Sequence, residues 1–322
     1  MKIVSWGIIG CGDVTEIKSG PAFNLVPDSE LVAVMRRDEK KAGDYAKRHG
    51  VRKWYSDAGD LINDTEVNAI YIATPPAYHE AYALQAFNAG KPVYVEKPMA
   101  LDSVQAERMK MASEETACKL SIAHYRRAQP RFKMILDLIS ENGIGEILSA
   151  EIKFHQTYQP GTENTWRTNP SISGGGLFHD LAPHQLDLML FFFGKPIKVE
   201  GASLNRANLY EADDYASAEI LFPNNIRFTG VWDFNSRIED EIDICEIKGT
   251  KGIIRFAVFS NFCETIINER LTQLEFDRLP HVQQPMIDQV VKYFLGQGSN
   301  PCSAEDAVEV MRMIDKITGK GN

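Results

Sequence analysis

The chain has 322 residues, enough for two domains of ordinary size, and its 44% apolar and 25% charged residues are typical of a globular protein. Its formal net charge of −9 argues against a nucleic-acid partner, because phosphate-rich polymers favour basic faces. No signal segment precedes the first strand and the apolar run 186–193 is too short to span a bilayer, so no membrane role is expected. Five well-separated cysteines without a Cys-x-x-Cys pair indicate a reducing compartment, and we expect a cytoplasmic protein.

A glycine-containing turn follows the first predicted strand, residues 4–9, and a second strand is predicted at residues 31–35. Gly10 permits the tight turn, and Gly12 lets the backbone approach a pyrophosphate closely. Thr15 stands where a third glycine or alanine would ease packing of the following helix. The spacing favours a dinucleotide site over an ordinary turn, and the cofactor-binding residues predicted in it are Gly10, Cys11, Gly12, Asp13 and Val14.

Strands and helices continue to alternate through the first part of the chain. Further strands are predicted at residues 54–55, 67–73, 92–95 and 120–123, and helices at residues 42–49, 81–88 and 104–116. This alternation is typical of an α/β doubly wound parallel sheet. We therefore predict a dinucleotide-binding domain over residues 1–126.

The pattern changes from Pro130 onward. After one helix that ends near residue 140, period-2 alternation predicts strands such as 215–222 and 226–234, joined by a turn at residues 223–225. Two helices, at residues 283–295 and 304–317, are predicted to close the chain. Residues 127–322 are therefore predicted to form an α+β domain with a large, mostly antiparallel sheet, which binds substrate and mediates oligomerisation.

Two polar motifs follow predicted parallel strands. Glu96, Lys97 and Pro98 come directly after the fifth strand, and Thr74 and Pro75 end an earlier one. Open α/β sheets bind ligands beyond the carboxyl ends of their strands, so Lys97 should point into a cofactor cleft. The alternative is a solvated lysine beside a turn proline.

The end of the second strand predicts which cofactor binds. Arg36 stands where an NAD enzyme would place the carboxylate that binds the ribose hydroxyls. The guanidinium of Arg36, with Arg37 beside it, can instead bind a 2′-phosphate and stack on adenine. We therefore expect NADP(H) to be favoured, with NAD(H) as a possible cofactor. In the alternative, both arginines are solvated and Asp38 binds the ribose.

A triple glycine precedes a segment in which Asp180, His184 and Asp187 share one helix face. If the helix begins near Asp180, Pro183 lies in its first turn, where a missing N–H costs little. Asp180 can fix the tautomer of the His184 ring and favour its cation, which makes an acid/base pair. Alternatively, Asp180 caps the helix and His184 is a core residue. Together with His179 these residues could also bind a metal, but no zinc spacing is present and no metal is expected.

Three smaller signals accompany these motifs. Trp166 and Arg167 lie shortly before the triple glycine and either clamp a cofactor or lie on a loop. His79, at the start of a helix, either faces the cofactor cleft or caps the helix. Tyr125, at the domain junction, either holds a sugar-like substrate or packs between the domains.

With these residues in view, the chain resembles the Gfo/Idh/MocA oxidoreductase family, named for glucose-fructose oxidoreductase and inositol dehydrogenase. The resemblance runs nearly end to end and rests on Gly10-x-Gly12, Ala73-Thr74-Pro75 with His79, Glu96-Lys97-Pro98, Trp166-Arg167 and Gly174-Gly175-Gly176 followed by Asp180-x-x-x-His184. It implies an N-terminal Rossmann domain, a C-terminal domain with an open-faced sheet used in dimers or tetramers, and NAD(P)-linked redox chemistry on sugars or polyols.

The resemblance also implies roles for single residues. It assigns Lys97, Asp180 and His184 to the catalytic site and implies a cis peptide before Pro98. The sequence departs from the family pattern where Ala182-Pro183 replaces the Gly-Ile commonly found before the histidine, and where Thr15 replaces a small third residue of the turn. Neither departure removes a reacting group, and both predict that helix entry and cofactor approach differ in detail from the family pattern.

The predicted function is hydride transfer between nicotinamide and a secondary alcohol or ketone carbon of a small carbohydrate-like substrate, at a site between the domains. The predicted substrate-binding residues are Lys97, Tyr125, Arg167, Asp180 and His184. Two alternatives are a non-catalytic nucleotide-binding sensor and a glycosidase or lyase that uses transient oxidation. A homodimer or homotetramer is expected, because a sheet covered by helices on one side leaves its other face needing a partner.

Overall fold

The computed structural model describes residues 2–320, which divide into two compact units. The first unit comprises Met1–Gln129 and Arg278–Val308, and the second comprises Pro130–Asp277 and Glu309–Asn322. The sequence pattern places the domain boundary close to the first division. It does not predict that Arg278–Val308 belongs with the first unit, because that association depends on contacts with residues far away in the sequence.

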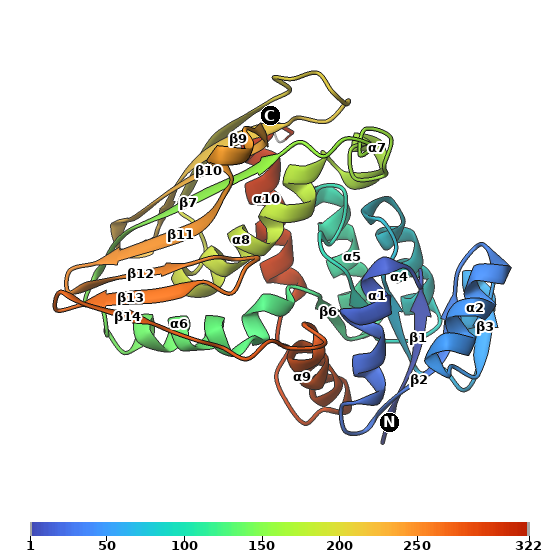
Figure 1. The fold of residues 1–322 in the computed structure, drawn as a ribbon. Coiled ribbons are helices and arrows are strands. Elements are labelled where there is room, and N and C mark those ends of the chain that lie inside the picture. Colours follow the sequence, from blue (N-terminus) through green and yellow to red (C-terminus); the bar gives the residue numbers. More distant parts are fainter. Residues whose placement is uncertain (1, 321–322) are drawn as a thin grey trace. The chain divides into compact units, whose positions relative to one another are not determined.

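Six parallel strands form the sheet of the first unit, in the order β3-β2-β1-β4-β5-β6 (Figure 1). The strands are β1 Val4–Ile9, β2 Ser29–Met35, β3 Lys53–Tyr55, β4 Ala69–Ile72, β5 Val93–Val95 and β6 Leu120–Ile122. The predicted doubly wound parallel sheet is thus confirmed. Strand order reverses between β1 and β4, so the turn after β1 lies at the switch point where such sheets bind ligands.

The helical segments of the first unit follow its strands. They are α1 Asp13–Ile17, η1 Gly20–Asn24, α2 Glu39–His49, α3 Ala58–Asn63, η2 Pro76–Tyr78, α4 His79–Asn88, α5 Ser103–Glu115, η3 Tyr125–Ala128 and α9 Gln284–Leu295. α1 is shorter than the predicted helix-length segment, because Pro21 lacks the N–H that a continuing α-helix needs. Asp38 caps α2 by accepting a hydrogen bond of 3.1 Å from the Lys41 N–H.

An eight-stranded sheet forms the second unit, in the order β14-β13-β12-β11-β7-β10-β9-β8. The strands are β7 Ile147–Thr157, β8 Lys198–Leu204, β9 Tyr215–Phe222, β10 Ile226–Ser236, β11 Ile242–Gly249, β12 Gly252–Phe256, β13 Cys263–Ile267 and β14 Arg270–Gln273. Neighbouring strands are antiparallel except β7 and β10, so the predicted mostly antiparallel sheet is confirmed. The predicted turn between β9 and β10 is η4, Pro223–Asn225.

Helices cover one face of this second sheet (Figure 1). The helical segments of this unit are α6 Pro130–Ser140, α7 Pro170–Ser173, α8 Leu177–Phe193 and η5 Ile238–Asp240, and α10 Ala304–Ile317 is divided between the two units after Val308. Along β10, Phe228, Trp232 and Phe234 are buried, whereas Val231 and Asp233 between them are only partly buried. Successive side chains of a strand point to opposite faces, so the sheet has a buried face under α8 and an open face.

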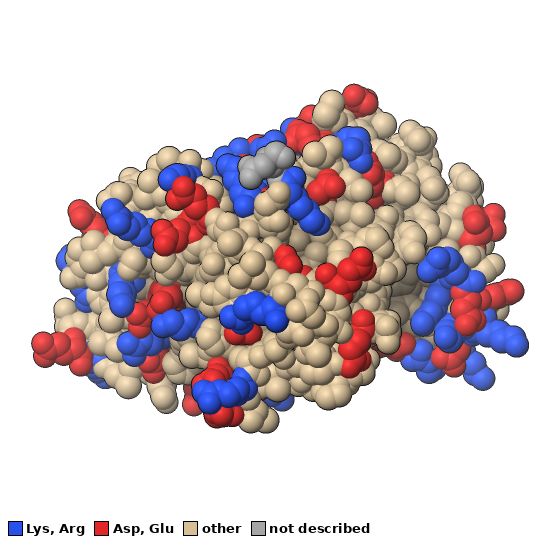
Figure 2. Space-filling model, turned by 90° about the horizontal axis from the view of Figure 1, so that it is seen from above, with Lys and Arg blue, Asp and Glu red and all other residues tan. Residues whose placement is uncertain are grey.

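Charged side chains of both signs are interspersed over the face in Figure 2. Ion pairs form among the described residues, as in the 2.7 Å contacts of Arg48 with Glu16 and Asp44. The pKa of Glu16 is lowered to about 2, chiefly by the hydrogen bond from Arg48. Within residues 2–320, no helix combines the length and hydropathy needed to cross a membrane.

Candidate active site

The turn after β1 is held against the end of β2. The N–H groups of Gly10 and Cys11 donate to the carbonyl of Met35 at 2.9 and 3.1 Å. Gly10 has φ +93°, and a Cβ there would come within 2.8 Å of Thr74 Cγ2, so both conformation and space require glycine. Gly12 differs, because a Cβ there would meet only the Gly10 carbonyl, at 3.9 Å. The missing side chain of Gly12 therefore leaves open space beside the turn.

α1 accommodates the residue that departs from the family pattern. Asp13 and Val14 begin this helix, and the following Thr15 is fully buried. Its hydroxyl donates to the Gly12 carbonyl at 2.8 Å, and its own carbonyl accepts a bond of 2.8 Å from the Tyr45 hydroxyl. Hydrogen bonding thus compensates the larger side chain at this position.

Of the two arginines that follow β2, Arg36 contacts the glycine turn and Arg37 packs on Tyr78. Arg36 Nη1 donates to the Cys11 carbonyl at 3.3 Å, and the Arg37 guanidinium lies 5.2 Å from the ring centroid of Tyr78. Burial raises the pKa of the Cys11 thiol to about 11, so the thiol is neutral. Asp38, the alternative ribose ligand, uses its carboxylate to cap α2.

His79 joins the loops that follow β4 and β5. Its Nε2 lies 2.7 Å from the Thr74 carbonyl, and its Nδ1 lies 3.0 Å from the Pro98 carbonyl. The ring is fully buried, and burial lowers its pKa to about 4. A neutral imidazole carries one N–H, so it donates to one of these carbonyls at a time. His79 therefore positions both loops, while the buried Thr74 Oγ1, without a partner among residues 2–320, can donate to a ligand.

Glu96 anchors the segment that carries Lys97. Its carboxylate, 6% exposed, accepts hydrogen bonds from the Tyr71 hydroxyl and from Gln283 Nε2, the latter at 2.6 Å. The Lys97 N–H donates to the same carboxylate at 3.2 Å, and the peptide bond after Lys97 is cis, as the resemblance implied. Burial, followed by the Glu96 charge, raises the pKa of Tyr71 well above its usual value, which keeps this donor protonated.

Tyr125 lies at the same edge of the sheet. It begins η3 directly after β6, is 6% exposed, and has the Arg126 guanidinium 5.5 Å from its ring centroid. The structure thus places the Gly10 turn, Thr74, Lys97 and Tyr125 after neighbouring strands, at their carboxyl ends. Ligands of doubly wound sheets bind in this position.

In the second unit, the helix that carries the predicted acid/base pair begins earlier than expected. α8 starts at Leu177, immediately after Gly176, whose φ of +84° ends the preceding turn. Pro183 is therefore inside the helix, and the expectation that it lies in the first turn is wrong. The carbonyl of His179 consequently lacks the N–H that an ordinary residue at position 183 would donate to it.

Asp180 and His184 lie one turn apart on α8, with His184 5% exposed. Arg167 Nε donates to Asp180 Oδ2 at 3.0 Å, and the Arg167 guanidinium lies 4.5 Å from the ring centroid of Trp166. The predicted clamp is therefore joined to the predicted catalytic carboxylate, a pairing that no sequence motif indicates. Asp187, on the same helix, is 1% exposed and belongs to the buried side of α8.

His179 lies in the core of the second unit. It is fully buried, and burial lowers its pKa to about 3, so the ring is neutral. A Cβ at Gly175 would collide with three atoms of this ring, which explains a glycine at that position. Within the described residues, no group of three or more His, Cys, Asp or Glu side chains could hold a metal ion.

The sequence motifs did not indicate one residue that lies near His184. The ring of Phe259 lies 5.7 Å from the His184 ring, at an interplanar angle of 79°. Phe259 occupies the connection between β12 and β13, which carries no recognisable motif. The sequence of a loop between two strands does not show which helix the loop will contact. This contact is therefore seen only in the tertiary structure.

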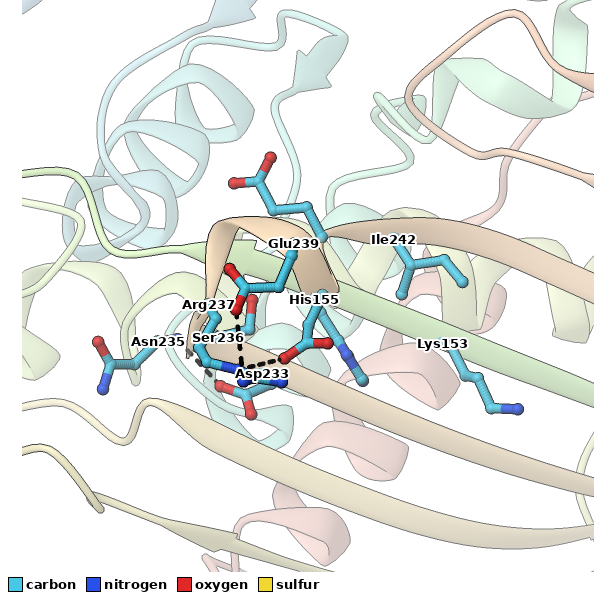
Figure 3. Close-up of a pocket in the computed structure, with 10 residues that line it drawn as sticks. Lys153, His155, Asp233, Asn235, Ser236, Arg237, Glu239 and Ile242 are labelled. Atoms are coloured by element: carbon cyan, nitrogen blue, oxygen red, sulfur yellow. Dashed lines mark hydrogen bonds and ion pairs between the residues drawn. The ribbon is translucent and has the colours of Figure 1, made fainter.

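A separate cavity of about 610 Å³ lies on the open face of the second sheet. Figure 3 shows Lys153 and His155 on β7, with Asp233 and Arg237 nearby. Lys153 and His155 alternate with Ile152 and Phe154, which are buried on the opposite face. The cavity contains none of the predicted site residues.

Comparisons with known proteins show the family of this chain. A family described as "Oxidoreductase family, NAD-binding Rossmann fold" matches residues 4–124, and the GFO/IDH/MocA C-terminal domain matches residues 132–255. Oxidoreductase P35 of Formosa agariphila is 45% identical over 320 residues, which covers 98% of each chain. The chain belongs to the Gfo/Idh/MocA oxidoreductase family. The relationship predicted from its motifs is thereby confirmed.

Two further similarities are to proteins named as carbohydrate enzymes. The 1,5-anhydro-D-fructose reductase of Ensifer adhaerens is 30% identical over 186 residues, covering 58% of this chain and 55% of that protein. A levoglucosan dehydrogenase solved with NADH and levoglucosan has a TM-score of 0.88 at 21% identity, covering 98% of this chain and 96% of that one. This second likeness shows the fold alone.

The open space at Gly12 suits the close approach of a dinucleotide pyrophosphate, and a substitution there tests whether the cofactor binds beside this turn. Gly12→Ala should weaken cofactor binding by about tenfold or more, because the new methyl group occupies the space through which the pyrophosphate approaches. Thermal unfolding without cofactor should be nearly unchanged, since the methyl group meets no close protein atom. Binding is measured by nicotinamide fluorescence, with Gly298→Ala as control. Unchanged affinity in Gly12→Ala would contradict this placement.

Proposed function

We propose that the chain is an NAD(P)-dependent oxidoreductase that acts on a secondary alcohol or ketone carbon of a sugar, polyol or related carbohydrate. The observation that carries the proposal is the position of Lys97 at the carboxyl end of β5 in a unit with an open glycine turn, together with an Asp180–His184 pair on α8. The names of the anhydrofructose and levoglucosan enzymes support a carbohydrate substrate.

Each side chain has a chemical role in this proposal. Bound nicotinamide supplies or accepts the hydride. His184 gives a proton to the substrate oxygen or takes one from it, and Asp180, oriented by Arg167, stabilises the charged imidazole. Lys97 donates a hydrogen bond to the same oxygen as its charge develops. Gly12, Thr74 and Arg36 would hold the cofactor.

A substrate screen tests the proposed activity. Purified protein is incubated with sugars, inositols, anhydro-sugars and sugar acids, with each nicotinamide cofactor in its oxidised and reduced forms, while the absorbance of reduced nicotinamide is followed. Stoichiometric change with one substrate class supports the oxidoreductase. Product formation without net change of the cofactor would favour the glycosidase or lyase alternative. Tight cofactor binding without turnover across the panel would favour the sensor.

We propose a preference for NADPH over NADH. Arg36 lies beside the glycine turn, and Asp38 is engaged in capping α2. Charge-assisted bonds to a phosphate contribute about 1.5–3 kcal/mol, so Arg36→Ala should weaken NADPH binding about ten- to a hundredfold and affect NADH little. Fluorescence titration measures both affinities, with the exposed Arg52→Ala as control. Equal or tighter NADH binding by the unaltered protein would contradict the preference.

We propose that two copies associate through the open face of the second sheet. Two cross-strand rows at its centre contain Val231, Lys153 and Ile244, and Asp233, His155 and Ile242. Apolar side chains beside charges of both signs suit a self-complementary interface. Small-angle scattering should report at least a dimer, and Val231→Asp should lower the mass by burying a charge. A monomer at high concentration of the unaltered protein would count against the association.

We also propose a cytoplasmic location. All five cysteines are free, and four of them are buried. Free thiols suit a reducing compartment. Cell fractionation with detection of the protein tests this assignment, and recovery from an extracytoplasmic fraction would contradict it.

A further inference from the structure

The connection between β12 and β13, residues 257–262, is called the Phe259 loop below. It is closed by a hydrogen bond of 2.9 Å from the Ala257 N–H to the Phe262 carbonyl. Asp243 of β11 accepts three backbone N–H groups from this loop, from Val258 at 3.0 Å, Phe259 at 2.6 Å and Ser260 at 3.2 Å. One carboxylate therefore holds three consecutive residues of the loop.

A buried arginine holds the same loop through its carbonyl groups. Arg131 of α6 is 6% exposed, and its Nη1 donates to the Ser260 carbonyl at 2.6 Å. Weaker bonds of 3.4 and 3.5 Å reach the carbonyls of Phe262 and Val258. Burying a charged guanidinium is costly unless its donors are satisfied, and these carbonyls satisfy it. The loop is thus restrained from two elements of the second unit.

The restrained loop presents one aromatic ring to α8. Phe259 is only partly buried, and its ring centroid lies 5.0 Å from that of Phe154 and 5.7 Å from that of His184. Phe154 is also the cross-strand neighbour of Asp243. The carboxylate that holds the loop and the ring against which Phe259 packs therefore come from paired positions of the sheet.

We propose that Phe259 is a positioning residue for His184, and that Asp243 and Arg131 act through it. The proposal rests on the proposed function of His184 as the proton-transferring group. The Phe259 ring packs almost perpendicular to the His184 imidazole and restricts the rotation of the imidazole. This contact therefore fixes the orientation of the imidazole toward the substrate. Because proton transfer depends on that orientation, loss of the Phe259 ring should impair turnover more than binding.

Matched variants test the proposal. Phe259→Leu should lower kcat about tenfold or more, alter the pH profile of kcat, and leave KM and cofactor affinity nearly unchanged. Phe259→Tyr, which keeps the ring, should retain most of the activity. Asp243→Asn should act in the same direction as Phe259→Leu, whereas Asp137→Asn, an exposed carboxylate change on α6, should behave like the unaltered protein.

A second measurement does not depend on turnover. The His184 ring protons, identified in NMR spectra by their loss in His184→Ala, should shift in Phe259→Leu and in Asp243→Asn but not in Asp137→Asn, because the Phe259 ring current is lost or displaced. Unshifted signals would overturn the inference even if no substrate is found. An active protein in which Phe259→Leu keeps kcat and its pH profile would overturn it while the proposed function stands. Shifted signals in a protein that turns over no substrate would leave the packing of Phe259 on His184 standing, but would refute the proposed function and with it the role of Phe259 in proton transfer.

Discussion

Replacing His184 with alanine should lower kcat on an identified substrate about 10²- to 10⁴-fold, the usual cost of losing a positioned acid or base. Reduction of a ketone leaves an alkoxide that must be protonated, and oxidation of an alcohol requires removal of its hydroxyl proton. We expect no other side chain to replace the His184 imidazole in this proton transfer. Cofactor affinity should change little, because the proposed role of His184 is proton transfer to the substrate and the residues proposed to hold the cofactor are Gly12, Thr74 and Arg36. Steady-state kinetics and fluorescence titration measure the two effects separately.

The control for His184 is His281→Ala, which removes an imidazole of the first unit that lies 2.6 Å from the Ile17 carbonyl. This variant should keep its turnover. If His184→Ala also turned over substrate at a near wild-type rate, the assignment would be wrong. Lys97 alone or Tyr125 would then become the leading proton donor.

Replacing Lys97 with alanine should cause a loss in kcat of similar size, about 10²- to 10⁴-fold. The buried Glu96 holds the Lys97 backbone N–H, so the Lys97 side chain leaves the main chain at a defined position after β5. The loss should appear in kcat, because the hydrogen bond strengthens as charge develops on the reacting oxygen. Lys40→Ala, which removes an exposed lysine of α2, is the matched control.

The double variant of Lys97 and His184 distinguishes a shared role from two separate ones. Groups that act on one oxygen are not independent, so the double variant should lose less than the product of the two single losses. Strictly multiplicative losses would indicate that the two side chains serve different steps. In that case, the assignment of both residues to one reacting oxygen would have to be abandoned.

Local sequence patterns were sufficient to predict the parallel sheet and the glycine turn. The period of apolar residues distinguishes strands from helices, and both depend on neighbouring residues alone. The positive φ of Gly10 and the helix cap at Asp38 are likewise consequences of local backbone geometry. The cis peptide after Lys97 was inferred from resemblance to a family and is present.

Only the tertiary structure decided which distant groups meet. Gln283 reaches Glu96 across 187 positions of the sequence, and this bond helps place Arg278–Val308 in the first unit. The Arg167–Asp180 ion pair and the hold of Asp243 on the Phe259 loop are equally invisible in local patterns. Such contacts depend on how sheets and helices pack. The sequence contains many residues of each type, and local patterns do not show which of them become neighbours. The sequence by itself therefore indicated the sheets, most of the helices and the candidate reactive residues, whereas packing determined which side chains hold those residues in place.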